Sequence, residues 1–301
     1  MMLGGFSAVL SDDQMGSWGG WRLPFLIAAP LGIVGIYLRT RLEDTPVFRE
    51  LEAQGKEEEN VGSEFKDLIT RYWAPILKLV GLVVALNVVN YTLLSYMPTY
   101  LEQSIGLSTN FSLVVPIIGM LAMMVFVPFA GHLSDRVGRK PLWWVSLAGL
   151  FVAVVPMFML MSTGVVGAII GFAVLGLLYV PQLATISAMF PAMFPTQVRF
   201  AGFAIAYNVS TSIFGGTAPA VNEWLVTESG NNLWPAFYMM GAVVVGMIAL
   251  SRVPETTRCP INGTEIPPGT PEAPPQLEYE TAGSRPDGGL LRRSPGRRRR
   301  R

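Results

Sequence analysis

The stretch GHLSDRVGRKP, residues 131–141, gathers titratable side chains between two long uncharged segments. Residues 111–130 before it and residues 142–198 after it contain no Asp, Glu, Lys, Arg or His. The titratable groups are His132, Asp135, Arg136, Arg139 and Lys140. A carboxylate in this setting can pair with an arginine or accept hydrogen bonds from the free N–H groups at the start of a neighbouring helix. The composition of the stretch therefore indicates a structured junction between two helices.

The other residues of this stretch fit the same interpretation. Gly131 and Gly138 permit tight backbone turns, and Pro141 suits the first turn of the helix that follows. The three cations would hold the loop at the cytoplasmic surface. Simple anchoring by positive charge is the alternative, but it leaves Asp135 and the two glycines unexplained.

A second set of candidate residues is polar and uncharged and lies within the apolar segments. Asn87, Tyr91 and Ser95 recur at i, i+4 and i+8 with Asn90 beside them, so a helix would place them in one stripe. The further candidates are Tyr179, Gln182 and Thr185 around Pro181, and Tyr207, Asn208, Thr211 and Ser212 before Gly215 and Gly216. These side chains would either line a solute cavity or form hydrogen bonds between helices. We prefer the cavity for Asn87, Tyr91 and Gln182, and keep Asn90, Tyr179, Tyr207 and Asn208 as further cavity candidates.

The elements that carry these residues follow from composition. The chain has 301 residues, of which 51% are hydrophobic and only 14% charged, with a mean hydropathy of +0.43. Soluble domains carry about 25% charged residues, so this chain lacks the groups that keep a globular surface hydrated. Several uncharged runs reach the length of about 20 residues that a membrane-spanning helix requires.

Seven apolar segments predict an all-α integral membrane protein. They are residues 23–38, 79–101, 111–131, 200–222 and 231–251, together with residues 142–198, which Ser162, Thr163 and Gly164 divide in two. Backbone polar groups in lipid must be satisfied within their own segment, so each span should be a helix. A buried core helix of a soluble protein would explain one such run but not seven.

The distribution of Lys and Arg predicts the orientation. The connections at residues 102–110, 162–164 and 223–230 contain neither residue, whereas residues 39–71, 136–140 and 197–200 all do. The basic connections and the C-terminus should therefore face the cytoplasm. We expect residues 39–73 to form a cytoplasmic linker with an amphipathic helix, and residues 254–301, rich in Pro, Gly and charge, to be a disordered cytoplasmic tail.

Several classes of function are disfavoured. The net charge of +1 gives no basic field for nucleic acid, and one cysteine with one histidine leaves no disulfide framework or metal cluster. The sequence has no P-loop and no nucleophile paired with a base. We therefore predict neither an enzyme nor a cofactor, and any transport would not be driven by ATP.

The junction sequence resembles the signature loop of the major facilitator superfamily, G-x-L-S-D-R-x-G-R-K, at every position. The stretches WGGWRLPFLIAAPLGIVGIYLRTRLEDTPVF (residues 18–48) and FPTQVRFAGFAIAYN (residues 194–208) are similar to its metabolite:proton symporter branch, which includes proline/betaine transporters. Such transporters have twelve spans in two halves. The resemblance implies that residues 1–38 hold the outer end of the fifth span and the sixth span, and that residues 74–253 form the C-terminal six-helix bundle. The first four spans and most of the fifth would then be absent.

The resemblance implies secondary active, proton-coupled uptake of small polar organic solutes such as betaine, proline or organic acids, in the cell membrane. Its partners would be the solute, protons, the bilayer, and either the missing N-terminal half or another membrane chain. None of the six later spans contains an Asp or Glu at mid-depth, so the coupling acids would belong to the missing half. The alternative is a non-transporting membrane scaffold or sensor derived from a transporter half.

Overall fold

The computed structural model describes residues 22–41, 70, 72–194 and 198–255, and these residues contain helices and no strand. Helix α3 (Leu23–Arg41) covers the first apolar segment. The predicted remnant of a fifth span and nearly all of the linker and tail lie outside the described residues, so the proposed division of the chain into these parts stays a prediction.

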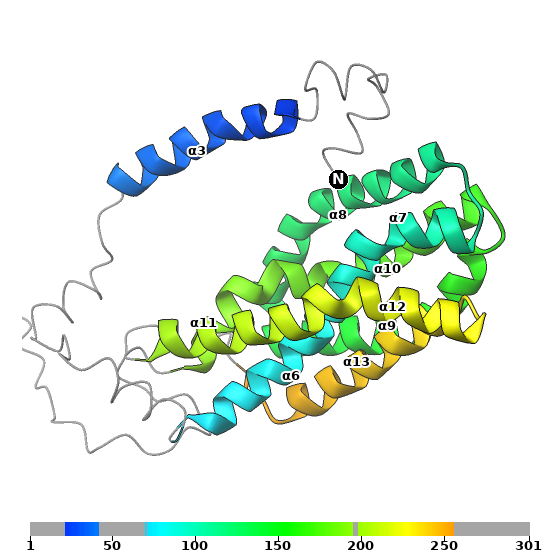
Figure 1. Ribbon diagram of the computed structural model, residues 1–301. Helices are drawn as coiled ribbons and strands as arrows, with labels where there is room; N and C mark the ends of the chain where they lie inside the picture. Colours follow the sequence, from blue (N-terminus) through cyan, green and yellow to red (C-terminus); the bar gives the residue numbers. More distant parts are fainter. Residues whose placement is uncertain (1–21, 42–69, 71, 195–197, 256–301) are drawn as a thin grey trace, which may run out of the picture. The chain divides into compact units, whose positions relative to one another are not determined.

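The remaining described helices form a bundle of six helical stretches (Figure 1). The first, residues 73–104, comprises α6 (Trp73–Asn90), the π-helical η2 (Tyr91–Tyr96), α7 (Met97–Thr99) and the π-helical η3 (Tyr100–Ser104). The next three are α8 (Thr109–Val137), α9 (Arg139–Met161) and α10 (Val165–Met189), with the short 3₁₀ turn η4 (Pro191–Met193) after them. The fifth comprises α11 (Arg199–Ser210), the π-helical η5 (Thr211–Gly215) and α12 (Gly216–Ser229), and the sixth is α13 (Trp234–Ser251).

The predicted helix boundaries are confirmed at the sharpest break. Helix α9 ends at Met161 and α10 begins at Val165, so the long uncharged segment is divided where Ser162, Thr163 and Gly164 stand. Gly164 has φ +125°, a left-handed conformation that glycine adopts without the steric cost of a Cβ. The two helices can therefore reverse direction within three residues.

Five described helices are long and apolar enough to cross a membrane: Trp73–Ser104, Thr109–Val137, Arg139–Met161, Val165–Met189 and Trp234–Ser251. Residues 199–229 are continuously helical but do not belong to this group, because polar side chains around η5 lower their hydropathy. Helix α3 does not belong to it either. The crossings predicted for α3 and for residues 199–229 stay predictions.

Helix packing follows the pattern expected in lipid, where small residues allow close approach. Helix α10 packs against α8 and α9, and α13 packs against α6 and α9. A Cβ at Gly81 would lie 2.6 Å from the Ala249 Cβ, and one at Gly246 would lie 2.5 Å from the Ala85 Cβ. Two glycine–alanine pairs thus bring α6 and α13 together, and side chains of any larger size would force them apart.

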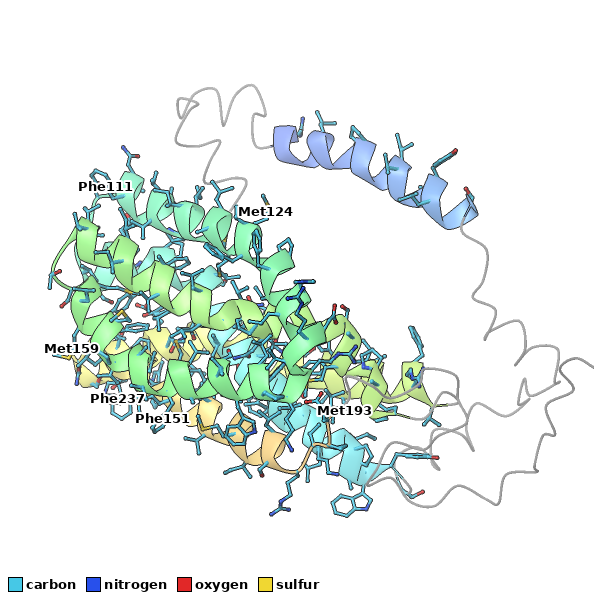
Figure 2. The ribbon with its side chains drawn as sticks, turned by 180° about the vertical axis from the view of Figure 1, so that it is seen from behind. Phe111, Met124, Phe151, Met159, Met193 and Phe237 are labelled. Carbon is cyan, nitrogen blue, oxygen red and sulfur yellow. The ribbon has the colours of Figure 1, made fainter. Side chains whose placement is uncertain are left out.

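Large apolar side chains also cover the outside of the bundle (Figure 2). Phe111 and Met124 on α8, Phe151 and Met159 on α9, and Phe237 on α13 are all exposed. Met124, for example, exposes 67% of its surface. A continuous apolar surface made of many such side chains would be unfavourable in water. The outer surface therefore suits the hydrocarbon of a bilayer.

Candidate solute site and charged junction

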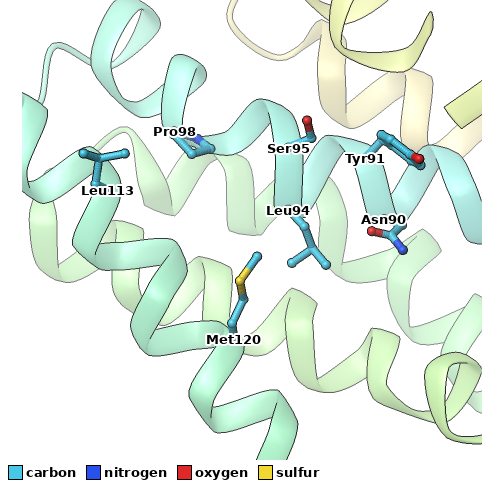
Figure 3. A pocket seen from close by; sticks show the side chains of 7 residues that line it. All are labelled: Asn90, Tyr91, Leu94, Ser95, Pro98, Leu113 and Met120. Atoms are coloured by element: carbon cyan, nitrogen blue, oxygen red, sulfur yellow. The ribbon is translucent and has the colours of Figure 1, made fainter. Parts of the chain in front are cut away.

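A hollow of about 370 Å³ lies between the first and second stretches of the bundle (Figure 3). Its lining is Asn90, Tyr91, Leu94, Ser95 and Pro98 from the first stretch and Leu113 and Met120 from α8. Leu94 and Met120 point toward each other across it. An amide, a phenol and a hydroxyl on an apolar wall, without a charged side chain in this lining, suit a small solute of no net charge.

Two of the three residues in the predicted stripe of Asn87, Tyr91 and Ser95 line the hollow, and the role of the stripe as a cavity wall stays a prediction. Tyr91 and Ser95 line the hollow, but Asn87 is buried and its Nδ2 donates to Thr211 Oγ1 at 2.9 Å. The Tyr91 N–H donates to the Asn87 carbonyl oxygen, so these two residues are one α-helical turn apart. Both therefore meet the fifth stretch, Asn87 at Thr211 and the Tyr91 ring at Gly215, and only Tyr91 also reaches the hollow.

Asn87 begins a row of polar contacts between the first and fifth stretches. Farther along, Asn222 Nδ2 donates to Thr92 Oγ1 at 2.8 Å, and the Tyr96 hydroxyl donates to Glu223 Oε2 at 3.0 Å. Such contacts between membrane helices contribute about 0.6–2 kcal/mol each. These contacts hold the two stretches in one rotation about their axes. In that rotation Tyr91 faces the hollow.

Two candidates from α10 are buried in helix interfaces. Gln182 Nε2 donates to Ser146 Oγ at 2.8 Å, and Ser146 donates to the Leu178 carbonyl oxygen at 2.6 Å. This geometry favours helix packing for Gln182. The Tyr179 hydroxyl is buried without a hydrogen-bond partner among the described residues, and Asn90 and Tyr207 are polar neighbours. Since Asn90 also lines the hollow, Tyr179 lies one side chain away from it.

The α11 candidates lie apart from the hollow's lining. Tyr207 is half-buried and its ring contacts that of Phe203, with centroids 5.4 Å apart. Asn208 is exposed and its Nδ2 donates to the Ala204 carbonyl oxygen of the same helix at 2.7 Å. The roles predicted for both in a solute cavity therefore stay predictions.

The charged stretch forms a junction at one end of the bundle, but with a different geometry from the one expected. Helix α8 continues through Gly131 to Val137, so the predicted turn at Gly131 is wrong: an uninterrupted hydrogen-bonded helix needs no special backbone conformation there. The turn is made by Gly138 alone, which has φ +109°. Pro141 lies in the first turn of α9, as predicted.

The carboxylate at the start of α9 belongs to Glu255 and not to Asp135. The backbone N–H groups of Arg139 and Lys140 donate to Glu255 Oε1 and Oε2 at 3.2 and 3.0 Å. Arg139 Nη1 also donates to the Ala188 carbonyl oxygen at 2.9 Å. Asp135 and Arg136 are exposed on the last turn of α8, and the Asp135 carboxylate makes no hydrogen bond with another described residue. The junction thus joins the ends of α8, α9, α10 and α13 that we expect to face the cytoplasm.

Comparison with known proteins identifies the family that this arrangement represents. Residues 1–207 match the model of the Major Facilitator Superfamily. The chain belongs to the major facilitator superfamily. As a member of this superfamily it is a multi-pass membrane protein, and the predicted family is confirmed.

Named relatives within the superfamily are transporters of small solutes. The chain is 38% identical over 264 residues to the proline/betaine transporter of Escherichia coli K12, and 38% identical over 264 residues to the glycine betaine/proline/ectoine/pipecolic acid transporter of Dickeya dadantii. It is 37% identical over 255 residues to the ectoine/proline transporter of Corynebacterium glutamicum. These alignments cover 85%, 85% and 81% of this chain but 52%, 52% and 50% of the relatives. The chain spans about half the length of the curated relatives it matches.

Proposed function

We propose that this chain provides the C-terminal half of a secondary active transporter for small zwitterionic solutes, coupled to protons, in the cell membrane. The observation that carries the proposal is the hollow beside Asn90, Tyr91 and Ser95, in a chain whose relatives are named for proline, betaine and ectoine. These solutes combine opposite charges in one small molecule. A polar, uncharged lining can solvate both charges, and the Tyr91 ring can contact a quaternary ammonium group by a cation–π interaction.

Proton coupling requires a titratable group whose charge changes during transport. The acids of the described region are Glu102, Asp135, Glu223, Glu228 and Glu255. They stand at helix ends or in the row between the first and fifth stretches, and none lines the hollow. We therefore place the coupling acids in a partner half, either covalently continuous with this one or supplied by another chain.

A fusion tests the proposal most simply. The part of the E. coli proline/betaine transporter that this chain does not match would be joined to the whole 301-residue chain, and uptake of labelled proline and glycine betaine would be measured in cells without their own uptake systems. We expect uptake that a protonophore abolishes, whereas the 301-residue chain alone should give none. A folded, membrane-inserted fusion without uptake would contradict the proposal and favour a scaffold or sensor.

The proposed orientation, with a cytoplasmic C-terminus, predicts which positions an impermeant thiol reagent reaches in intact cells. With Cys259 replaced by Ser, we expect reaction at Gln103→Cys and Thr227→Cys, but not at His132→Cys. All three positions are exposed in the structure, so the membrane alone separates them. Reaction at His132→Cys without reaction at the other two would reverse the orientation.

Asp135 has a separate proposed role in the fusion. Its carboxylate is exposed and makes no hydrogen bond with the side chains or backbone of other described residues, so it is able to contact the partner half in the state that closes the cytoplasmic side. We expect Asp135→Asn to reduce uptake while leaving the amount of folded fusion unchanged. Equal loss of uptake and of folded protein would make Asp135 a folding residue.

A further inference from the structure

We propose that Gly215 determines the size of the solute hollow by leaving room for the Tyr91 ring. This inference rests on the proposed function, because it assigns to a residue outside the hollow the control of which solutes fit inside it. Gly215 is the last residue of η5 and is buried, and it is not among the residues that line the hollow.

The contact between Gly215 and Tyr91 is close enough to leave no space for a methyl group. A Cβ at Gly215 would lie 2.7 Å from Tyr91 Cε2, 3.0 Å from Cδ2 and 3.3 Å from Cζ. Carbon atoms pack at about 3.5–4.0 Å, so one edge of the ring rests on the glycine backbone. The absent side chain is therefore what allows the ring to occupy its position.

The surroundings fix where the ring would move if that space were filled. The Asn87–Thr211 hydrogen bond and the Asn222–Thr92 hydrogen bond hold the two stretches together on either side of this contact. Separation of the helices would break them, whereas the hollow beside the ring is open. We expect an added methyl group to drive the ring into the hollow and reduce its volume.

The adjacent glycine provides a matched control. Gly216 and Gly215 both have right-handed helical backbone angles, so alanine is compatible with the backbone at either position. A Cβ at Gly216 meets nothing within 4 Å. The two substitutions are therefore chemically identical and adjacent in the chain, but only the one at Gly215 is buried and meets the Tyr91 ring.

Uptake by the fusion gives the first test. Since overpacking of a filled site costs enough to change binding about ten-fold, we expect Gly215→Ala to reduce the uptake efficiency for glycine betaine by about ten-fold. The bulkier ectoine should lose more than the compact proline. Gly216→Ala should retain uptake within about two-fold. In a Tyr91→Leu background, Gly215→Ala should have little further effect, because the double change removes the colliding ring.

A second measurement needs no transport and so separates this inference from the proposed function. In the full chain with Cys259→Ser and Ser95→Cys, the rate of modification by thiol reagents of increasing size reports access to the hollow. We expect Gly215→Ala, but not Gly216→Ala, to slow the larger reagents, with equal amounts of both variants in the membrane. Equal rates in the two variants would overturn the role of Gly215. If Gly215→Ala slows the larger reagents but the fusion transports no solute, the inference about Gly215 holds and the transport proposal is refuted.

Discussion

Replacing Gly138 by alanine is expected to destabilise the protein by about 2 kcal/mol, whereas the same change at Gly131 should stabilise it by about 0.5–1 kcal/mol. Both glycines belong to the charged junction, but only Gly138 has a positive φ, of +109°. A Cβ there would also lie 3.0 Å from Glu255 Oε2 and 3.2 Å from Pro141 Cδ. At Gly131, in the interior of α8, an added methyl group meets nothing within 4 Å.

Thermal unfolding of the purified full chain in detergent, followed by its helical circular dichroism, measures the two changes side by side. The midpoint should fall for Gly138→Ala and rise for Gly131→Ala. Shifts of the same sign would show that the two glycines have equivalent surroundings, contrary to the structure.

The second large effect is expected at Glu255. Glu255→Gln should cost about 1–2 kcal/mol, because an amide has one oxygen and no net charge with which to accept from two N–H groups at a helix start. The carboxylate lies 3.2 Å from the Arg139 nitrogen and 3.0 Å from the Lys140 nitrogen. Its loss would loosen the segment after α13 from the start of α9.

Asp135→Asn is the matched control for this change, since it removes a carboxylate from the same junction. The Asp135 side chain is exposed and makes no hydrogen bond with another described residue, so the full chain should change in stability by less than about 0.5 kcal/mol. The same thermal measurement decides between the two carboxylates. A larger loss of stability from Asp135→Asn than from Glu255→Gln would show that Asp135, and not Glu255, caps α9.

Helix positions were predictable from the sequence because lipid imposes a simple requirement. Uncharged runs of sufficient length must be helical, and the break at Ser162, Thr163 and Gly164 interrupts such a run with polar and flexible residues. The charged junction between α8 and α9 was predictable for the same reason, because its charged side chains can lie only where the chain leaves the hydrocarbon. Local composition was sufficient for these features.

Side-chain directions were less predictable, because they depend on contacts between distant segments. The i, i+4 spacing of Asn87 and Tyr91 indicates one face, and both meet the fifth stretch, but the spacing does not show that Asn87 bonds to Thr211 while Tyr91 also lines the hollow. The cap on α9 comes from Glu255, 116 residues after Arg139. No local pattern in the sequence distinguishes that carboxylate from Asp135, which is much closer along the chain.

The most direct test of the account is whether the transported solute occupies the hollow. In the fusion with Ser95→Cys and all other cysteines replaced by serine, a thiol reagent would modify residue 95 with and without glycine betaine or proline. We predict that either solute slows the modification several-fold, with a half-effect near the concentration that gives half-maximal uptake, and leaves a Gln103→Cys control unchanged. An unaltered rate at residue 95 under saturating solute, in a fusion that transports it, would contradict the account.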